Sequence, residues 1–184
     1  MYQPLTIGEK IYFSPLNKED FVTNMLRWVN DPEVTHYMFT GTLPATLEQL
    51  EEEYKQITKS KNEVVFAIID KEANKYIGNI GLYQINWTSR TAEMRRFIGE
   101  KKVWKKGYGT EAAKLIVAYG FERLNLNRIW AGNNVENIGS WKSNEKAGFK
   151  REGILRQEIY RNGKYYDAVR HGILREEYFA NKGK

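Results

Sequence analysis

The sequence contains no cysteine, which excludes disulfide scaffolds, thiolate metal sites and cysteine nucleophiles. Only two histidines are present, His36 and His171, and their separation does not match a zinc-binding helix motif. Residues 1–10 lack the basic segment and apolar run of a secretory leader, and no later stretch is apolar enough to span a membrane. We therefore expect a protein that has no resident metal, stays in the cytoplasm and has no membrane partner.

The residues that are present fit one globular domain. Of 184 residues, 41% are hydrophobic, and a second independent core would leave each half close to the lower size limit of a stable domain. The net charge of +6 would suit a polyanion such as RNA or a phosphorylated cofactor. Basic and acidic residues are interspersed, however, and a solvated surface is the simpler explanation. We expect a single domain over residues 1–184 without direct nucleic-acid binding.

Periodicity and turn signals divide the chain into helices and strands. Helical spacing and capping residues predict helices at about residues 17–30, 46–58, 108–124 and 137–147. Runs bounded by turn residues predict strands at about residues 10–16, 64–70, 76–87, 91–99, 128–132, 149–164 and 165–174. Asn162-Gly163 tolerates positive φ at both positions and predicts a hairpin. This order predicts an α+β fold, a three-layer α/β/α arrangement around a mixed, mostly antiparallel sheet of six to seven strands.

A glycine-bearing loop joins the predicted strand 91–99 to the long helix that follows it. Its residues are Lys105, Lys106, Gly107, Tyr108, Gly109 and Thr110. A helix start offers free N–H groups to phosphate, and the two glycines let an anion approach closely. The lysines add positive charge and Thr110 adds a hydroxyl. The loop thus predicts a phosphate site, with an ordinary tight turn as the alternative.

The same loop also has to be compared with two nucleotide-binding motifs. Gly107, Gly109 and Ala112 satisfy the G-x-G-x-x-A dinucleotide fingerprint, which favours an NAD-type oxidoreductase. That fingerprint requires an acidic residue at the end of the next strand, where this sequence has Asn133 and Asn134. A P-loop is excluded because no Gly-Lys-Ser or Gly-Lys-Thr follows the glycines. The NAD-type enzyme is therefore the less favoured alternative.

Three groups of motifs together resemble the GNAT superfamily of N-acetyltransferases, particularly its ribosomal-protein-type and small-amine branch. Residues 98–112 resemble the strand and acetyl-CoA pyrophosphate loop, and residues 137–149 resemble the helix beside the pantetheine arm. Residues 28–34, 152–156 and 166–167 resemble flanking signatures of that branch. The resemblance spans nearly the whole chain. It implies the GNAT acyl-CoA N-acyltransferase fold, in which the parallel strands 91–99 and 128–132 splay apart and admit the cofactor.

The resemblance also implies where acetyl-CoA binds as co-substrate. The pyrophosphate would lie on the loop of residues 105–110, and the pantetheine arm would bond backbone groups between the splayed strands. Around Phe97 and Ile98, a free N–H would bond the thioester oxygen. Asn137 and Asn144 would contact the cofactor from their helix. As the alternative, Asn137 only caps that helix.

Two residues are implied to carry the chemistry, which needs a neutral amine and a proton for the departing thiolate. Glu93 lies in a segment that resembles the acid-bearing strand of the branch, and it would be the base. Many family members carry a tyrosine as the acid where this chain has Asn144, and Ser140 matches the serine that the branch uses instead. The alternatives are an ion pair of Glu93 with Arg95 or Arg96 and a solvated Ser140.

The resemblance implies an acetyl-CoA-dependent N-acetyltransferase that transfers directly to a primary amine, without metal or covalent enzyme intermediate. The acceptor would be a peptide or protein N-terminus, as in a ribosomal protein, or a small amine such as a polyamine, amino sugar or aminoglycoside. The sequence leaves this choice open. The missing tyrosine and the basic charge also allow a non-catalytic acyl-CoA- or ribosome-binding module on the same fold. Homodimers are common among members of the family.

Overall fold

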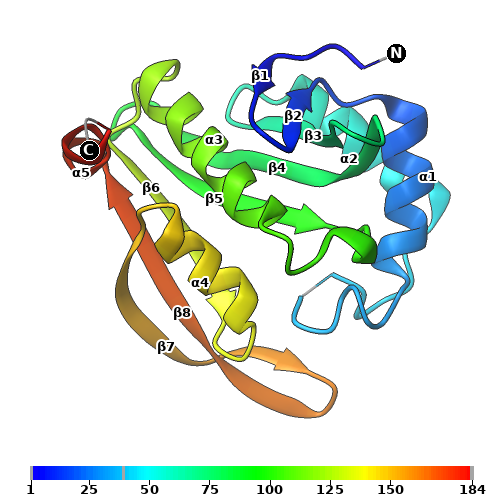
Figure 1. The fold of residues 1–184 in the computed structure, drawn as a ribbon. Helices are drawn as coiled ribbons and strands as arrows, with labels where there is room; N and C mark the ends of the chain where they lie inside the picture. Colours follow the sequence, from blue (N-terminus) through cyan, green and yellow to red (C-terminus); the bar gives the residue numbers. More distant parts are fainter. Residues whose placement is uncertain (1, 39, 183–184) are drawn as a thin grey trace.

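The computed structural model describes residues 2–38 and 40–182, and a mixed sheet of eight strands lies at its centre (Figure 1). Its strands are β1 (Thr6–Ile7), β2 (Ile11–Ser14), β3 (Val64–Asp70), β4 (Lys75–Asn86), β5 (Thr91–Ile98), β6 (Arg128–Asn134), β7 (Lys150–Arg161) and β8 (Lys164–Leu174). Their spatial order is β1-β2-β3-β4-β5-β6-β8-β7, and only β5 and β6 pair in parallel. The predicted fold class is confirmed. The eighth strand is β1, which has two residues and too little alternation to be predicted.

Two layers of helices cover the sheet. The helices are α1 (Lys18–Val29), α2 (Leu47–Lys59), α3 (Tyr108–Glu122), α4 (Ile138–Lys146) and α5 (Arg175–Asn181), with a 3-10 turn η1 (Lys101–Val103). One buried cluster joins α3 to one face of the sheet, and a second joins α1 and α2 to the other face. Among the described residues, no helix has the length and apolar character needed to cross a membrane.

Local capping explains where α1 and α2 begin, as the sequence predicted. The N–H of Asp20 donates to Asn17 Oδ1 (3.0 Å) at the start of α1. Thr46 and Gln49 form both hydrogen bonds of a capping box at the start of α2. Asn162 and Gly163 both have positive φ in the turn between β7 and β8, so the hairpin prediction is also confirmed.

The parallel pair β5–β6 is short, and the two strands then part. Only Thr91, Ala92 and Glu93 of β5 have partners on β6, and the register ends at Glu93 opposite Trp130. Beyond this point β5 continues along β4, while β6 continues along β8. Figure 1 shows the two halves of the sheet diverging, with the segment between α1 and α2 near the open end. The predicted splay is thus present.

Backbone alternation decides which groups of β5 face the resulting gap. The carbonyl of Arg90 accepts hydrogen bonds from the N–H groups of Asn127 and Arg128 at the start of β6. The N–H of Gly99, by contrast, donates to the carbonyl of Ile77 in β4. Because successive residues of a strand point to opposite sides, the N–H groups of Arg96 and Ile98 face the gap. Those of Phe97 face β4. The gap therefore presents Arg96 and Ile98 to an amide-rich ligand, and Phe97 contributes its side chain.

The close approach of α1 to the end of β5 depends on Gly99. A Cβ added at Gly99 would lie 2.0 Å from Cδ2 of Trp28, which is 3% exposed. We expect Gly99→Ala to lower the free energy of unfolding by about 2 kcal/mol, because the indole must move within a packed core. Urea denaturation measures this difference. Gly139→Ala is the control, since nothing lies within 4 Å of the added Cβ on α4; an equal loss there would contradict the steric explanation.

Candidate active site

A cleft of about 510 Å³ opens where β5 and β6 part, and most of the predicted site residues of β5 and α4 lie along it, whereas Ile98 is outside its described lining. Its lining includes Glu93, Phe97, Asn137, Ser140 and Asn144. Residues of α1, α2 and the segment between them close the opposite side of the cleft. The structure therefore brings together residues that are up to about 50 positions apart in the sequence. Their individual roles remain predictions.

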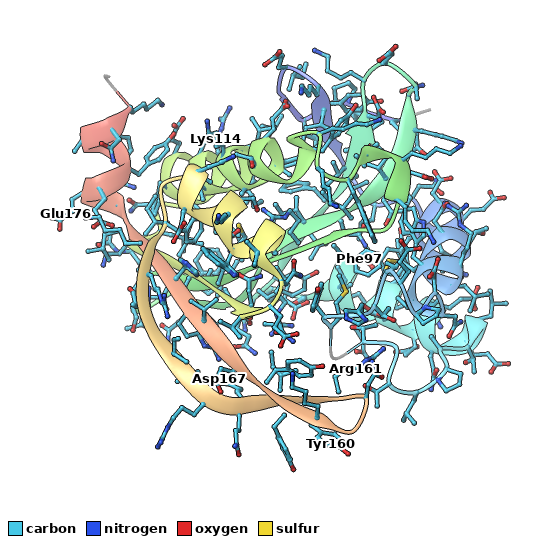
Figure 2. All side chains as sticks on the ribbon, turned by 60° about the horizontal axis from the view of Figure 1, so that its bottom comes forward. Phe97, Lys114, Tyr160, Arg161, Asp167 and Glu176 are labelled. Carbon is cyan, nitrogen blue, oxygen red and sulfur yellow. The ribbon has the colours of Figure 1, made fainter. Side chains whose placement is uncertain are left out.

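The side chains of β5 divide the cleft into two sides. Glu93, Arg95 and Phe97 lie on the face covered by α1 and α2, and Phe97 packs against Trp28 of α1 at 6.0 Å between ring centroids. Figure 2 shows Phe97 beside α1. Arg96 lies on the other face, where it contacts α3 and α4. We refer to these as the α1/α2 side and the α3/α4 side.

The glycine-bearing loop forms the start of α3, next to the α3/α4 side. Gly107 is the N-cap with φ of 90° and makes no side-chain cap bond, so the first N–H groups of α3 are left to other partners. Lys10 Nζ donates to the carbonyl of Lys106 (3.0 Å), which adds a third lysine to the loop. These features fit a phosphate group. Lys105, Gly109 and Thr110 complete the predicted loop, which adjoins the described cleft lining without forming part of it.

A hydrogen-bond network surrounds the hydroxyl of Ser140 on α4. Ser140 Oγ accepts from Asn133 Nδ2 (2.9 Å) and from Arg96 Nη2 (3.3 Å). With both lone pairs engaged, the hydroxyl proton is free to be donated into the cleft. Asn137 Oδ1 accepts from the N–H of Ser140 (3.2 Å), so Asn137 caps α4 while also lining the cleft.

Asn144 supplies a buried acceptor without a partner. Its Nδ2 donates to Asn133 Oδ1 (2.9 Å), but its Oδ1 has no hydrogen-bond partner among the described residues, and the side chain is 1% exposed. A buried acceptor of this kind costs free energy unless a ligand donates to it. The amide N–H groups of a pantetheine arm lying in the gap fit this requirement.

Glu93 forms the ion pair that was the alternative to a catalytic role. Its Oε2 accepts from Arg95 Nε (2.9 Å) and Arg95 Nη2 (2.6 Å), and Arg95 lies over the ring of Tyr83. The guanidinium stabilises the negative charge of the carboxylate. Among the described residues, Oε1 has no hydrogen-bond partner. Glu93 is therefore held in place through one oxygen and can accept a proton on the other.

Further carboxylates give the α1/α2 side an excess of negative charge. Partial burial and the neighbouring Glu63 raise the pKa of Glu53, which lines the cleft from α2. Burial, together with the charges of Glu53 and Glu63, raises the pKa of Tyr83. Within the described part of the chain, neither Glu53 nor Glu63 forms a salt bridge. This side of the cleft is suited to a cation.

The segment between α1 and α2, which carries Tyr37 and Met38 in the cleft lining, is held from two directions. Arg161 of β7 donates to Thr42 Oγ1 (2.9 Å) and Thr35 Oγ1 (3.2 Å), and Figure 2 shows it pointing toward this segment. On the other side, Lys101 pairs with Asp31 and Glu33. The lining of the α1/α2 side thus depends on contacts between distant parts of the chain.

Sequence reasoning did not identify Arg96, Asn133, Glu53 or Tyr83 as site residues. A signal for Arg96 did exist, because it alternates with Ala92 and Met94, which are both buried on the same face. A charged residue at an expected core position is a sign of function or of a specific partner. Among the described residues, no group of histidine, aspartate or glutamate side chains is arranged to hold a metal ion.

Comparisons with known proteins agree with this geometry. A family model described as an acetyltransferase (GNAT) domain matches residues 10–150. The chain is 33% identical over 177 residues to the spermidine N(1)-acetyltransferase of Escherichia coli K12, covering 94% of this chain and 90% of that protein. It is 32% identical over 174 residues to an uncharacterised N-acetyltransferase of Bacillus licheniformis, covering 92% and 96%.

A solved structure gives the same result. The spermidine N-acetyltransferase of Vibrio cholerae in complex with CoA and spermine superposes with a TM-score of 0.84 at 28% identity, covering 94% of this chain and 99% of that one. Matches of this extent favour neither an NAD-type oxidoreductase nor a non-catalytic module. The chain belongs to the GNAT family and is an acetyl-CoA-dependent N-acetyltransferase.

Proposed function

We propose that the acceptor is a small polycationic amine of the polyamine class, and that the acetyl group passes directly from acetyl-CoA to one of its primary amines. The observation that carries this proposal is the pair Glu53 and Glu63, neither of which forms a salt bridge among the described residues. Glu53 lines the α1/α2 side of the cleft, and Glu63 is close enough to raise the pKa of Glu53. Carboxylates placed in this way attract a second ammonium group while the first reacts. A polyamine carries both groups on one flexible chain.

The relatives support the same class of acceptor. Two of the proteins reported above are named for spermidine, and one of them was solved with spermine. The ribosomal-protein-type branch, which the sequence also resembles, uses a protein N-terminus. A peptide N-terminus carries only the reacting amine. It therefore does not require the pair Glu53 and Glu63 in addition to the base Glu93. The charge of the α1/α2 side therefore favours the polyamine over the peptide.

Glu93 is the base in this proposal. An alkylammonium with a pKa near 10.4 is neutral in only about one molecule in two thousand at pH 7, so the site must supply on the order of 4–5 kcal/mol of help. The unpartnered Oε1 of Glu93 can take the proton directly or through one water. Arg95 holds the other oxygen, which fixes the direction of the carboxylate.

The α3/α4 side would bind acetyl-CoA. The loop of residues 105–110 would hold its phosphates, and Asn144 together with the N–H groups of Arg96 and Ile98 would bond the amides and the thioester oxygen. Ser140 would take the place of the acid and donate a hydrogen bond to the departing sulfur. Because one continuous sheet uses residues from 6 to 174, we also propose that residues 1–184 form a single catalytic domain.

An acceptor panel tests the proposed substrate class. Release of free thiol from acetyl-CoA is measured with spermidine, spermine, amino sugars, aminoglycosides and N-terminal peptides. We expect spermidine or spermine to give the highest kcat/KM. Glu53→Gln should raise the KM for spermidine roughly fivefold at low ionic strength, in keeping with the loss of one exposed charge contact of about 1 kcal/mol. A peptide as the best acceptor, or an unchanged spermidine KM in Glu53→Gln, would contradict the proposal.

A further inference from the structure

Arg96 is a partly buried cation that has only neutral hydrogen-bond partners among the described residues. Its Nη1 donates to the carbonyl of Gly109 at the start of α3 (2.7 Å), and its Nη2 donates to Ser143 Oγ (2.6 Å) and Ser140 Oγ (3.3 Å) on α4. No carboxylate forms a salt bridge with it. Burial alone lowers the pKa of Arg96 to about 10, so the side chain stays charged at neutral pH.

A charge that is partly withdrawn from water and has no counter-charge is unfavourable, and an apolar residue in its place would normally be more stable. Hydrogen bonds to two carbonyls and two hydroxyls engage Nη1 and Nη2 of Arg96 but leave its charge uncompensated. The neighbours of Arg96 on β5 that share its face, Met94 and Ile98, belong to the apolar cluster beneath α3. The location therefore suits an anion that is present during only part of the reaction.

The network around Arg96 points to the leaving group as that anion. Arg96 lines the cleft at the gap where the pantetheine arm would lie, and its guanidinium donates to the same oxygen, Ser140 Oγ, that faces the proposed position of the sulfur. Asn133 donates to this oxygen from the opposite side. With two donors behind it, the Ser140 hydroxyl becomes a stronger hydrogen-bond donor toward the cleft.

We propose that Arg96 is a positioning residue that orients and polarises the Ser140 hydroxyl, so that the pair stabilises the CoA thiolate as it departs. The inference rests on the proposed acyl transfer. Glu93 first accepts the ammonium proton and passes it to water, and the neutral amine then forms the C–N bond. The C–S bond breaks with its electron pair going to sulfur, and the second proton leaves the nitrogen for Glu93. Ser140 keeps its proton and donates a hydrogen bond to the sulfur anion. The thiolate then leaves or takes a proton from water.

This arrangement fits the chemistry of the leaving group. A thiol has a pKa near 8.5, far below that of a serine hydroxyl, so stabilising the thiolate requires less than transferring a proton from serine. Positive charge beside a thiolate lowers the pKa of the thiol. The Arg96–Ser140 pair therefore performs the task for which many family members carry tyrosine, and it explains why Asn144 is tolerated at that position.

The pKa of the bound CoA thiol tests the proposal without any acceptor. Calorimetry compares the affinity for CoA with the affinity for desulfo-CoA, in which hydrogen replaces the thiol, between about pH 6 and 9.5. If the site favours the thiolate, the affinity for CoA divided by the affinity for desulfo-CoA rises with pH. The rise continues up to the free thiol pKa near 8.5, and the ratio then levels off. We expect a rise of about tenfold, which corresponds to a pKa lowered by about one unit.

Two variants separate the effect of the charge of Arg96 from the effect of its hydrogen bonds to α3 and α4. Arg96→Gln can still hydrogen-bond Ser140 but has no charge, and we expect the ratio to become flat. Arg96→Lys keeps the charge and should keep most of the rise. In turnover, Arg96→Gln should lower kcat about tenfold, with the KM for acetyl-CoA changed less than threefold. Equal losses in both variants would show that Arg96 only joins α3 to α4, and would overturn the proposal.

A matched control removes a similar contact elsewhere. Arg175 donates to the carbonyl of Phe121 (2.6 Å) in the same way that Arg96 donates to Gly109, but it lies outside the described cleft lining. Arg175→Gln should leave the pH dependence of the affinity ratio unchanged. Since no acceptor is used, failure of every polyamine in the panel would count against the proposed substrate and leave this measurement intact. A flat ratio in the unmodified protein would count against Arg96 alone.

Discussion

Glu93→Gln is expected to lower acceptor-dependent turnover roughly 100- to 10,000-fold, the range that a positioned general base contributes. The amide has nearly the same shape but cannot accept the proton of the acceptor's ammonium group, which must become a neutral amine before it attacks. In the proposed arrangement acetyl-CoA lies on the other side of β5, so its KM should change little. Free-thiol release at saturating acceptor measures the loss, and binding of CoA by calorimetry verifies that the cofactor side is intact.

The pH profile separates a base from a structural carboxylate. We expect kcat of the unmodified enzyme to fall toward low pH as an essential base becomes protonated, and this limb should flatten in Glu93→Gln. Glu152→Gln is the control, because Glu152 also pairs with an arginine, Arg128, at 2.6 Å but lies outside the described cleft lining. Equal effects of the two variants on kcat, or an unchanged low-pH limb in Glu93→Gln, would remove Glu93 from the mechanism.

The parts of the fold that could be predicted from sequence are those fixed by local interactions. The caps at Asn17 and Thr46 and the turn at Asn162-Gly163 involve residues no more than three positions apart, and all three were predicted correctly. The strand β1 and the helix α5 are short, with too few residues to show a period. Their positions follow from pairing with β2 and from contacts with β8, which sequence patterns do not record.

The candidate site shows the same difference between what local sequence and what long-range contacts determine. The resemblance placed Glu93, Ser140 and Asn144 near acetyl-CoA, and the structure gathers all three at one cleft. Arg96 was missed because its partners on α4 lie 44 and 47 positions away. The contacts of Arg161 with the segment between α1 and α2 span still longer separations. The contacts of Arg96 and Arg161 can be recognised only in the folded protein, because their partners come together when the sheet forms and its two halves part.

Gly107→Asp is expected to raise the KM for acetyl-CoA about 100-fold while kcat at saturation changes much less. Gly107 is the N-cap of α3, where free N–H groups and three lysines would meet the pyrophosphate. A carboxylate about 5 Å from a phosphate charge in a partly solvated site costs about 3 kcal/mol, which is close to two powers of ten in affinity. Initial rates at varied acetyl-CoA concentration measure the change.

Backbone strain is the competing explanation, because Gly107 has a φ of 90° and aspartate adopts positive φ with some cost. Gly163→Asp makes the same replacement at a φ of 76°, in the hairpin turn, where nothing lies within 4 Å of the added Cβ. It should carry a similar conformational cost without affecting the KM for acetyl-CoA. High salt should partly restore binding to Gly107→Asp, because screening weakens charge repulsion and leaves strain unchanged. A KM that rises equally in both variants, or that does not respond to salt, would place the phosphates somewhere other than the start of α3.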